Sequence, residues 1–165
     1  KGIMTPMVND QKEALEIVKY SKYPPKGRRG AGFGFAHNEY KKENPIDVME
    51  HANKTLINIV QIENESGLEN VEKIAKIDDV DCLWVGHFDL SNFLGVPGQF
   101  GSKLYLDAIN KIVKVGEMYK KSLGIMVSTR QEMTFYSDLG FNVIAVGTEM
   151  KLLTDKISNL IKNKG

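Results

Sequence analysis

The sequence predicts an α/β fold built on a parallel β-sheet. Short apolar runs of the kind found in strands alternate with longer segments whose apolar residues recur at helical spacing, and this alternation is typical of repeated βα units. We expect five strands, at residues 2–8, 56–63, 81–86, 122–127 and 141–147. Five units are too few to close an eight-stranded barrel, which takes about 250 residues. An open doubly wound sheet is therefore an alternative that the residues leave open.

The segments between these strands predict helices. Asn9 and Asp10 offer an N-cap for a first helix, which should end before Pro24. Residues 45–53 predict a short helix that leads into the second strand. Three later helices are predicted from apolar residues at helical spacing: Leu68, Val71, Ile74 and Ala75; Leu106, Ile109, Ile112 and Val113; and Leu153, Ile157, Leu160 and Ile161.

A glycine-rich stretch at residues 24–34 separates the first helix from the second. It is too rich in glycine for a helix and too long for a simple turn, so we expect a functional loop. It follows a helix rather than a strand, and so it does not match a dinucleotide-binding fingerprint. Arg28 and Arg29 are predicted to hold this loop in place rather than to bind a substrate.

Composition excludes several classes of function. The chain has 165 residues, of which 26% are charged, and a formal net charge of +1. Lys and Arg are mixed with Asp and Glu, which argues against a nucleic-acid partner. No apolar stretch approaches the roughly 20 residues of a membrane span. The single Cys82 lies in an apolar run, which predicts a buried thiol and a cytoplasmic location.

Two acidic residues mark the ends of consecutive predicted strands. Glu63 closes the second strand and Asp89 follows the third, so both should face the mouth where parallel α/β folds bind ligands. Gln61 should point to the same side as Glu63, because side chains alternate along a strand. Two carboxylates, with waters and a chelating substrate, suit Mg²⁺ or Mn²⁺ and tolerate Co²⁺ or Zn²⁺. Alternatively, each carboxylate caps the helix after it, and spacing alone does not decide between the two readings.

Four motifs resemble one enzyme family. Gly2–Val8, Tyr23–Gly30, Gln61–Glu63 and Gly86–Ser91 stand in the order found in the class II, metal-dependent pyruvate aldolases, which include 4-hydroxy-2-oxoheptanedioate and 2-dehydro-3-deoxyglucarate aldolases. The resemblance implies a TIM (β/α)8 barrel of the phosphoenolpyruvate/pyruvate-binding type, with the fourth to eighth βα units present here. Residues 1–165 would form a single domain. The C-terminal helix, 149–163, would be exchanged between the subunits of a homo-oligomer, a hexamer by resemblance.

The same resemblance implies a function. Enzymes of this family cleave or form a 4-hydroxy-2-oxo acid, giving pyruvate and an aldehyde through a metal-stabilised enolate, in the catabolism of aromatic compounds or sugar acids. Glu63 and Asp89 match the metal ligands, and Gln61 matches a polar residue beside pyruvate. The backbone N–H groups around Phe88 and Asp89 match those that receive the pyruvate carboxylate. The residues that match the family's aldehyde pocket are Ala31, Gly32, Met126 and Thr148.

The sequence departs from the family pattern at three points. His87 stands where Pro is common, and Glu149 stands where Asp is common. The family's catalytic His and substrate-binding Arg follow its second and third strands, and neither strand is found here. Because Lys1 directly precedes an apolar run, we expect an N-terminal part upstream that carries both residues, and we expect the chain alone to be inactive.

Other readings remain open beside the aldolase. No Lys ends a predicted strand, which disfavours an aldolase that works through an imine. A lyase that acts on citramalyl- or malyl-coenzyme A would use the same kind of site. The alternative that is not an enzyme is a truncated barrel without catalytic activity. His87 is expected to face solvent or to support the site, and Trp84 is expected to belong to the core.

Overall fold

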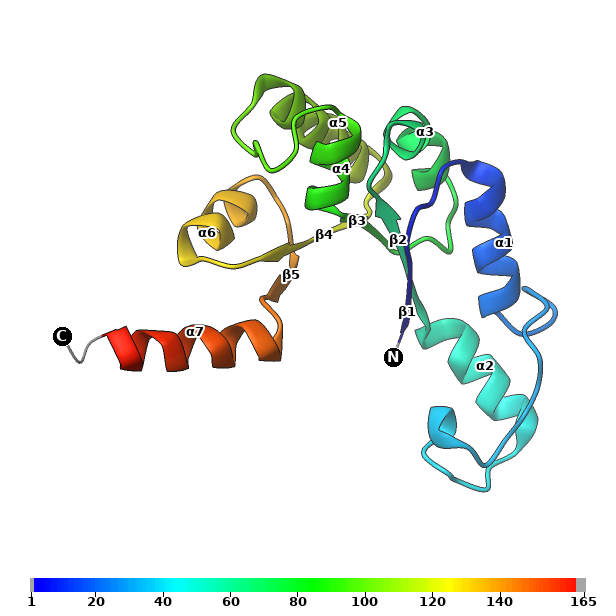
Figure 1. Cartoon of the computed structure of the whole chain (residues 1–165). Coiled ribbons are helices and arrows are strands. Elements are labelled where there is room, and N and C mark those ends of the chain that lie inside the picture. The colour runs from blue at the N-terminus through cyan, green and yellow to red at the C-terminus, as the bar shows by residue number, and fades with distance from the viewer. Residues whose placement is uncertain (1, 163–165) are drawn as a thin grey trace.

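The computed structural model describes residues 2–162 and contains five parallel strands with helices around them (Figure 1). The strands are β1 (Gly2–Thr5), β2 (Ile57–Ile62), β3 (Cys82–Val85), β4 (Ser122–Val127) and β5 (Val143–Val146). The helices are α1 (Gln11–Ser21), the 3₁₀ turn η1 (Ala36–Asn38), α2 (Pro45–Thr55), α3 (Glu65–Ala75), α4 (His87–Phe93), α5 (Lys103–Tyr119), α6 (Arg130–Asp138) and α7 (Glu149–Lys162).

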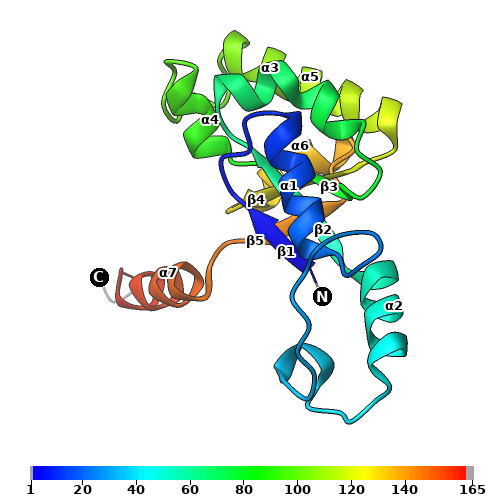
Figure 2. The same cartoon turned by 90° about the vertical axis from the view of Figure 1, so that its right-hand side faces the viewer.

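The strand order decides between the two predicted architectures. The strands pair in the order of the sequence, β1-β2-β3-β4-β5, and every pairing is parallel. A doubly wound sheet reverses its strand order partway across, so that alternative is wrong. Right-handed connections that always step in one direction place their helices on one face of the sheet. The result is a curled, barrel-like sheet with α1, α3, α5 and α6 around its outside (Figures 1 and 2).

The two faces of this sheet are buried to different degrees. The residues that face the helices are almost fully buried: Val60, Ile62, Leu83, Val85, Leu123 and Ile125. On the opposite, concave face, Met4 is 43% exposed and Ile57 is 45% exposed. Trp84 and Cys82 are the buried part of that face, at 9% and 2% exposed, and both side chains lie close to Gly124. The predictions of a buried Cys82 and a core Trp84 are confirmed.

Most predicted elements are confirmed with shifted ends. β4 matches its predicted range, whereas β1 stops at Thr5 because Pro6 has no N–H for the ladder and Met7 adopts a left-handed backbone (φ 53°). α3 starts at Glu65, earlier than predicted, because the Asn64 side chain accepts a hydrogen bond from Gly67 N–H and caps the helix. Helix α6 was not predicted, and α4 was expected only as the helix that Asp89 would cap in the capping alternative.

The start of the glycine-rich loop is tied to the last turn of α2, just before β2. Tyr23 and the Asn53 side chain exchange two hydrogen bonds, with Tyr23 N–H donating at 2.7 Å and Asn53 Nδ2 donating at 3.0 Å. The Arg29 guanidinium lies over the Tyr23 ring, 4.5 Å from its centre. This contact supports the predicted structural role of Arg29.

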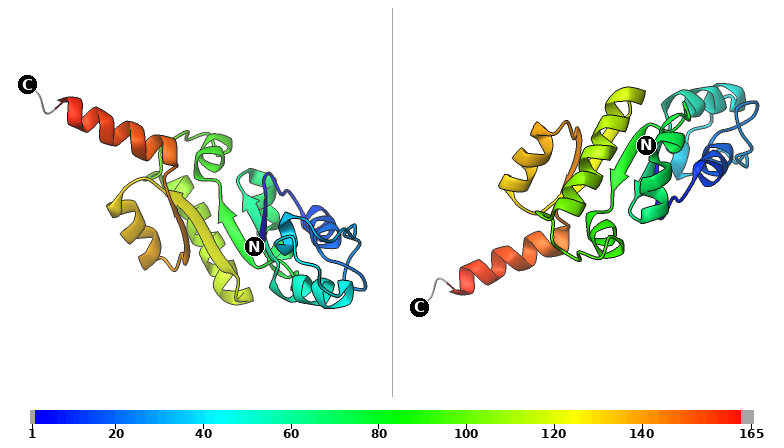
Figure 3. Two further views of the ribbon diagram at one scale, coloured as in Figure 1. Left: turned by 90° about the horizontal axis from the view of Figure 1, so that it is seen from below. Right: turned by 90° about the horizontal axis from the view of Figure 1, so that it is seen from above.

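Helix α7 projects away from the rest of the chain (Figures 1 and 3). It occupies the predicted C-terminal helix up to Lys162, while Asn163 lies outside the described residues. Its predicted apolar stripe is largely exposed, with Leu153 at 59%, Ile157 at 48% and Leu160 at 60%. Across residues 2–162, no helix is both long enough and apolar enough to cross a membrane.

Candidate metal and substrate site

The carboxyl ends of four neighbouring strands bring the predicted site residues together. Glu63 directly follows β2, Asp89 lies three residues beyond the Gly86 that ends β3, Met126 is near the end of β4, and Thr148 follows β5. Ile62 pairs with Val85 in the parallel register, so Glu63 and Gly86 lie side by side. We call this edge of the sheet the mouth.

Glu63 is a buried carboxylate with hydrogen-bond donors on two sides. The residue is 4% exposed, and its Oε1 accepts a hydrogen bond from Met7 N–H at 2.6 Å. With its amide nitrogen turned towards Glu63, Gln61 donates to both carboxylate oxygens at 3.1 Å. Within residues 2–162, no Lys, Arg or His forms an ion pair with Glu63. A carboxylate withdrawn from water in this way is well suited to a cation.

Gly86 makes room for that carboxylate. A β-carbon built on Gly86 would overlap Glu63 Oε2 and would lie 2.7 Å from Glu63 Cβ. Any larger residue would therefore push the Glu63 side chain out of its place. The glycine at the end of β3 lets the carboxylate of the neighbouring strand lie flat across the mouth.

The capping alternative fails for both acidic residues. Asn64, not Glu63, caps α3. Asp89 is the third residue of α4, whose N-cap is Gly86 with no side-chain hydrogen bond. Asp89 is exposed at the mouth and has no ion-pair partner within the described residues. Neither carboxylate is therefore explained by helix capping.

Helix α4 begins at the mouth and leaves backbone donors there. Its first intrahelical hydrogen bond runs from Leu90 N–H to the Gly86 carbonyl at 2.8 Å. The N–H groups of Phe88 and Asp89, in the first turn, have no intrahelical acceptor. The Phe88 side chain is 61% exposed beside them.

A supporting set of residues was missed from the sequence. Met7 directs its N–H at Glu63 from a left-handed backbone, and Asn9 Nδ2 donates to the Met7 carbonyl at 2.9 Å. Asn64 Nδ2 donates to Asn9 Oδ1 at 2.7 Å, so the α3 cap is linked to this turn. The Asn64-x-x-Gly67 spacing was a readable N-cap signal. Met7 had none, since it lies 56 residues from Glu63 in the chain.

Two predicted pocket residues are not brought to the mouth. Ala31 and Gly32 lie in the loop whose beginning, at Tyr23, is bonded to Asn53 near the start of β2. The loop then runs away from the sheet towards η1 and α2 (Figures 1 and 2). The mouth is at the other end of β2, about 20 Å along the strand. A single copy of the chain therefore does not place these residues beside Glu63.

The most buried lysine has a structural role. Lys22 is 3% exposed, and its Nζ donates to the carbonyls of Asn53 at 2.9 Å and Leu56 at 3.2 Å, with Asp79 Oδ1 at 3.3 Å. Leu56 precedes β2, so this amine is also at the end opposite the mouth. Lys22 therefore holds these carbonyls together and does not lie beside Glu63.

His87 stands at the mouth, whereas His37 and His51 lie in η1 and α2, away from it. The His87 ring is half-buried against Phe88 and Phe100, with ring centres 4.6 and 5.0 Å apart. Burial lowers the pKa of His87, while the negative charges of Glu132 and Asp89 act in the opposite direction. The ring is partly covered, and its predicted supporting role stays a prediction.

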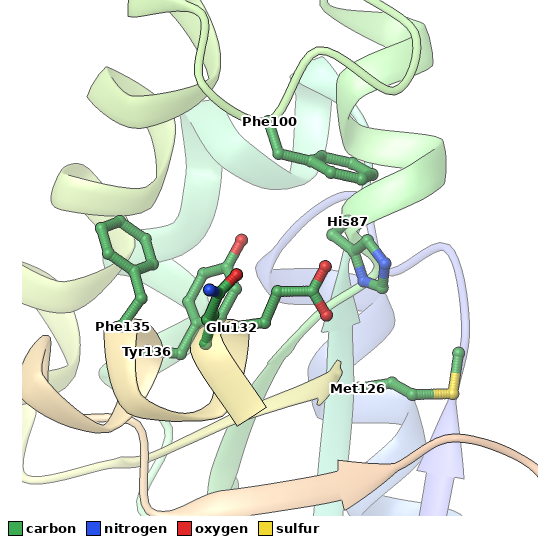
Figure 4. Close-up of a pocket in the computed structure, with 7 residues that line it drawn as sticks. His87, Phe100, Met126, Glu132, Phe135 and Tyr136 are labelled. Atoms are coloured by element: carbon green, nitrogen blue, oxygen red, sulfur yellow. The ribbon is translucent and has the colours of Figure 1, made fainter. Parts of the chain in front are cut away.

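A cavity of about 260 Å³ lies next to His87 (Figure 4). Its walls come from α4, the loop before α5, β4 and α6. Tyr136 in this wall shares a hydrogen bond with Tyr105, with the hydroxyl oxygens 2.9 Å apart, and burial raises the pKa of both hydroxyls. The residues that line the cavity include His87, Phe100, Met126, Glu132, Phe135 and Tyr136.

The mouth fits a hard cation through few protein ligands. No group of three or more His, Cys, Asp or Glu side chains suited to a metal is found within residues 2–162. Glu63 and Asp89 supply carboxylate oxygens, the donors that Mg²⁺ and Mn²⁺ prefer. Glu63 fits this use because it is buried and lacks a cationic partner.

Known proteins resemble the chain over almost all its length. It is 33% identical over 151 residues to the hydroxypyruvate/pyruvate aldolase of Delftia acidovorans, covering 92% of this chain and 56% of that protein. It is also 33% identical over 152 residues to the 4-hydroxy-2-oxo-heptane-1,7-dioate aldolase of Escherichia coli, covering 92% of this chain and 57% of that protein. The chain therefore spans a little over half the length of these curated relatives.

A solved structure agrees with these matches. An HpcH/HpaI aldolase/citrate lyase family protein from Burkholderia cenocepacia superposes with a TM-score of 0.90 at 25% identity, covering 98% of this chain and 64% of that one. The family model described as HpcH/HpaI aldolase/citrate lyase matches residues 1–155. The resemblance found in the four motifs is confirmed. With the family model matching residues 1–155, the chain belongs to the HpcH/HpaI aldolase/citrate lyase family.

Proposed function

We propose that this chain provides the metal-holding part of an aldolase that cleaves a 4-hydroxy-2-oxo acid to pyruvate and an aldehyde, or runs the reverse condensation. The observation that carries the proposal is Glu63, a buried carboxylate at the mouth with two donors and no cationic partner within the described residues. Asp89 on the next strand's helix is the second ligand. Mg²⁺ or Mn²⁺ is the proposed cation.

The chain's own residues would position the metal and the oxo acid. Met7 and Gln61 orient the Glu63 carboxylate, and Gly86 gives it room. The unpaired N–H groups of Phe88 and Asp89 would receive the pyruvate carboxylate, because backbone donors at a helix start favour anions. When bound, the cation supplies positive charge where the keto oxygen becomes negative. Met126 and Thr148, at the ends of the next two strands, would border the aldehyde.

In this proposal the five strands are the fourth to eighth of a TIM (β/α)8 barrel. Their sequential parallel order supports it, as does the TM-score of 0.90 over 98% of this chain. The acid/base His and the substrate-binding Arg expected from the family would come from βα units outside this sequence.

We further propose that α7 packs on a second copy of the chain in a homo-oligomer. Its exposed apolar side chains support this, since Met150 and Ile161 are 68% and 67% exposed in addition to the stripe described above. An amphipathic helix whose apolar stripe is exposed in its own chain gains apolar contacts from a neighbour.

The experiment measures pyruvate. Pyruvate release from a free 4-hydroxy-2-oxo acid is followed before chelation, after chelation and after refilling with Mn²⁺, and a malyl or citramalyl thioester is tested in parallel. Because the acid/base His and the substrate-binding Arg are expected outside this sequence, we expect the chain alone to give little or no release, and any release to require both the free acid and metal. Calorimetric titration of pyruvate with and without Mn²⁺ is run alongside, because it reports the metal site even without turnover. Pyruvate binding that does not depend on metal would contradict the proposal. Turnover of the thioester would instead favour a lyase that acts on malyl- or citramalyl-coenzyme A.

A further inference from the structure

The cavity beside His87 is close to the proposed metal site. Ile62 pairs with Val85, and Val85 pairs with Ile125, so Glu63, Gly86 and Met126 follow at one level of the sheet. Adjacent strands are about 4.8 Å apart, which places the backbones of Glu63 and Met126 about 10 Å from each other. Met126 lines the cavity (Figure 4). A ligand held at Glu63 and Asp89 could therefore extend past Met126 into it.

The cavity is of a size that would enclose part of a ligand rather than a whole ligand. Its volume is about 260 Å³, whereas pockets that enclose whole ligands have volumes of roughly 300–1,000 Å³. A single ring or a short branched chain would fill it. The substituent of an aldehyde, which differs from one substrate to another, is a fragment of this size.

The walls of the cavity are mainly aromatic. Phe100 packs at 5.0 Å from His87 and at 5.3 Å from Tyr105, and Phe135 lies edge-on to Tyr136 with ring centres 5.1 Å apart. The Tyr136 hydroxyl is already bonded to Tyr105, so it does not require a polar group from a ligand. These walls favour an apolar, ring-like group.

The charge in the wall comes from Glu132. Its Oε2 accepts hydrogen bonds from Ser128 N–H at 2.7 Å and from Thr129 N–H at 3.1 Å, in a capping box that starts α6. The capping box fixes the position of the carboxylate. The other polar groups in the lining belong to His87, Gln131 and Tyr136, and no Lys or Arg of the described chain lines the cavity. A ligand group with a negative charge would meet Glu132 without a compensating cation.

We propose that this cavity is a specificity subsite that takes the distal group of the aldehyde, and that it accepts an uncharged, ring-sized apolar group while rejecting a carboxylate. The inference rests on the proposed function and narrows its substrate class. It separates this chain from an aldolase for dicarboxylic substrates, such as the relative named for 4-hydroxy-2-oxo-heptane-1,7-dioate.

The test uses the methyl group of Met126 as a reporter. Methionine methyl groups are labelled with ¹³C, and the Met126 signal is assigned by its loss in Met126→Leu. Benzyl alcohol and 4-(hydroxymethyl)benzoate, which differ by one carboxylate, are titrated into the protein. We expect benzyl alcohol to shift the Met126 signal and the benzoate to bind about tenfold more weakly. Equal or tighter binding of the benzoate would overturn the proposal, and so would a Met126 signal that neither compound shifts.

Two variants with matched controls check the wall. Phe135→Ala should weaken benzyl alcohol binding about fivefold. Phe93→Ala should leave it unchanged, since Phe93 has a similar exposure, 42% against 45%, but does not line the cavity. Glu132→Gln keeps the capping box and removes the charge, so it should reduce the preference against the benzoate to less than about threefold. Equal effects of the two Phe variants, or an unchanged preference in Glu132→Gln, would contradict the assignment.

The same spectra separate this proposal from the metal site. Mn²⁺ bound at Glu63 and Asp89 should broaden the Met126 signal, and Glu63→Gln with Asp89→Asn should abolish that broadening. Broadening without a benzyl alcohol shift would reject the subsite and keep the metal. A benzyl alcohol shift without broadening would keep the cavity as a binding site and reject its link to the aldolase.

Discussion

The two faces of the sheet differ in how fully this chain buries their side chains. On the helix-covered face, Ile62 and Val85 are fully buried. On the concave face, Ile57 in the same strand as Ile62 is 45% exposed. The helix-covered face is a finished core made from α1, α3 and α5. On the concave face, at the mouth and on α7, side chains are exposed, and contacts with other molecules or chain segments would cover them.

The largest expected effect tests this contrast within a single strand. Ile62→Ala should lower the free energy of unfolding by about 2–5 kcal/mol, because it leaves a cavity in the packed core. Ile57→Ala, the same substitution on the concave face, should cost less than about 1 kcal/mol. Urea unfolding measures both. Similar losses for the two variants would show that the concave face is covered in solution.

Cys82 sharpens the comparison, because it lies on the concave face and yet is 2% exposed, close to Gly124. Burial raises the pKa of the Cys82 thiol to about 12, so the thiol stays protonated at pH 8. We expect an aromatic disulfide reagent to modify it at least about a hundredfold more slowly in the native protein than in urea. The absorbance of the released thiolate gives both rates. Fast modification of the native protein would mean that this part of the face is open.

Gly86 tests the packing of the mouth. Gly86→Ala should lower the free energy of unfolding by about 1–3 kcal/mol and should displace the Glu63 carboxylate. Gly101→Ala is the control, since nothing lies within 4 Å of a β-carbon built there. Thermal unfolding and Mn²⁺ titration are measured for both variants. If Gly86→Ala binds Mn²⁺ as the unaltered chain does, the proposed position of Glu63 is wrong.

Helix α7 offers the smallest expected change. Ile157→Glu places a charge in the apolar stripe and should weaken self-association about tenfold. Asn159→Glu adds the same charge two residues away on the polar side of the helix and should leave association unchanged. Sedimentation over a range of concentrations gives the association constants. Equal behaviour of the two variants would remove α7 from the interface.

The helix-covered face could be predicted from the sequence, because the apolar patterns that indicate its strands and helices lie within single segments. The short apolar run at 122–127 predicted β4, and the apolar stripe from Leu68 to Ala75 predicted α3. Helix α6 was missed because Tyr136 is its one buried residue, so its apolar periodicity is weak. The capping box from Thr129 to Glu132 was the available signal.

Only part of the mouth could be predicted from the sequence. Strand ends located Glu63 and Asp89, but spacing did not separate metal ligands from helix caps. Capping was excluded by the structure, in which Asn64 caps α3 and Gly86 is the N-cap of α4, whereas the metal role stays a prediction. The contacts that position Glu63 come from distant segments: Met7 N–H and the close approach of Gly86. The position that a side chain takes across neighbouring strands depends on packing between segments that are distant in the chain. Such packing cannot be derived from a single sequence. For Ala31 and Gly32, the loop path was likewise not visible from the sequence.

Mn²⁺ binding tests the central claim most directly. Electron paramagnetic resonance of free Mn²⁺ is measured during titration of the unaltered chain, of Glu63→Gln with Asp89→Asn, and of the control Glu65→Gln, an exposed carboxylate in the first turn of α3. We predict that the double variant binds Mn²⁺ at least about tenfold more weakly, since it loses both charged ligands. The control should bind as the unaltered chain does. Unchanged Mn²⁺ affinity in the double variant would contradict the assignment of Glu63 and Asp89 as the metal site.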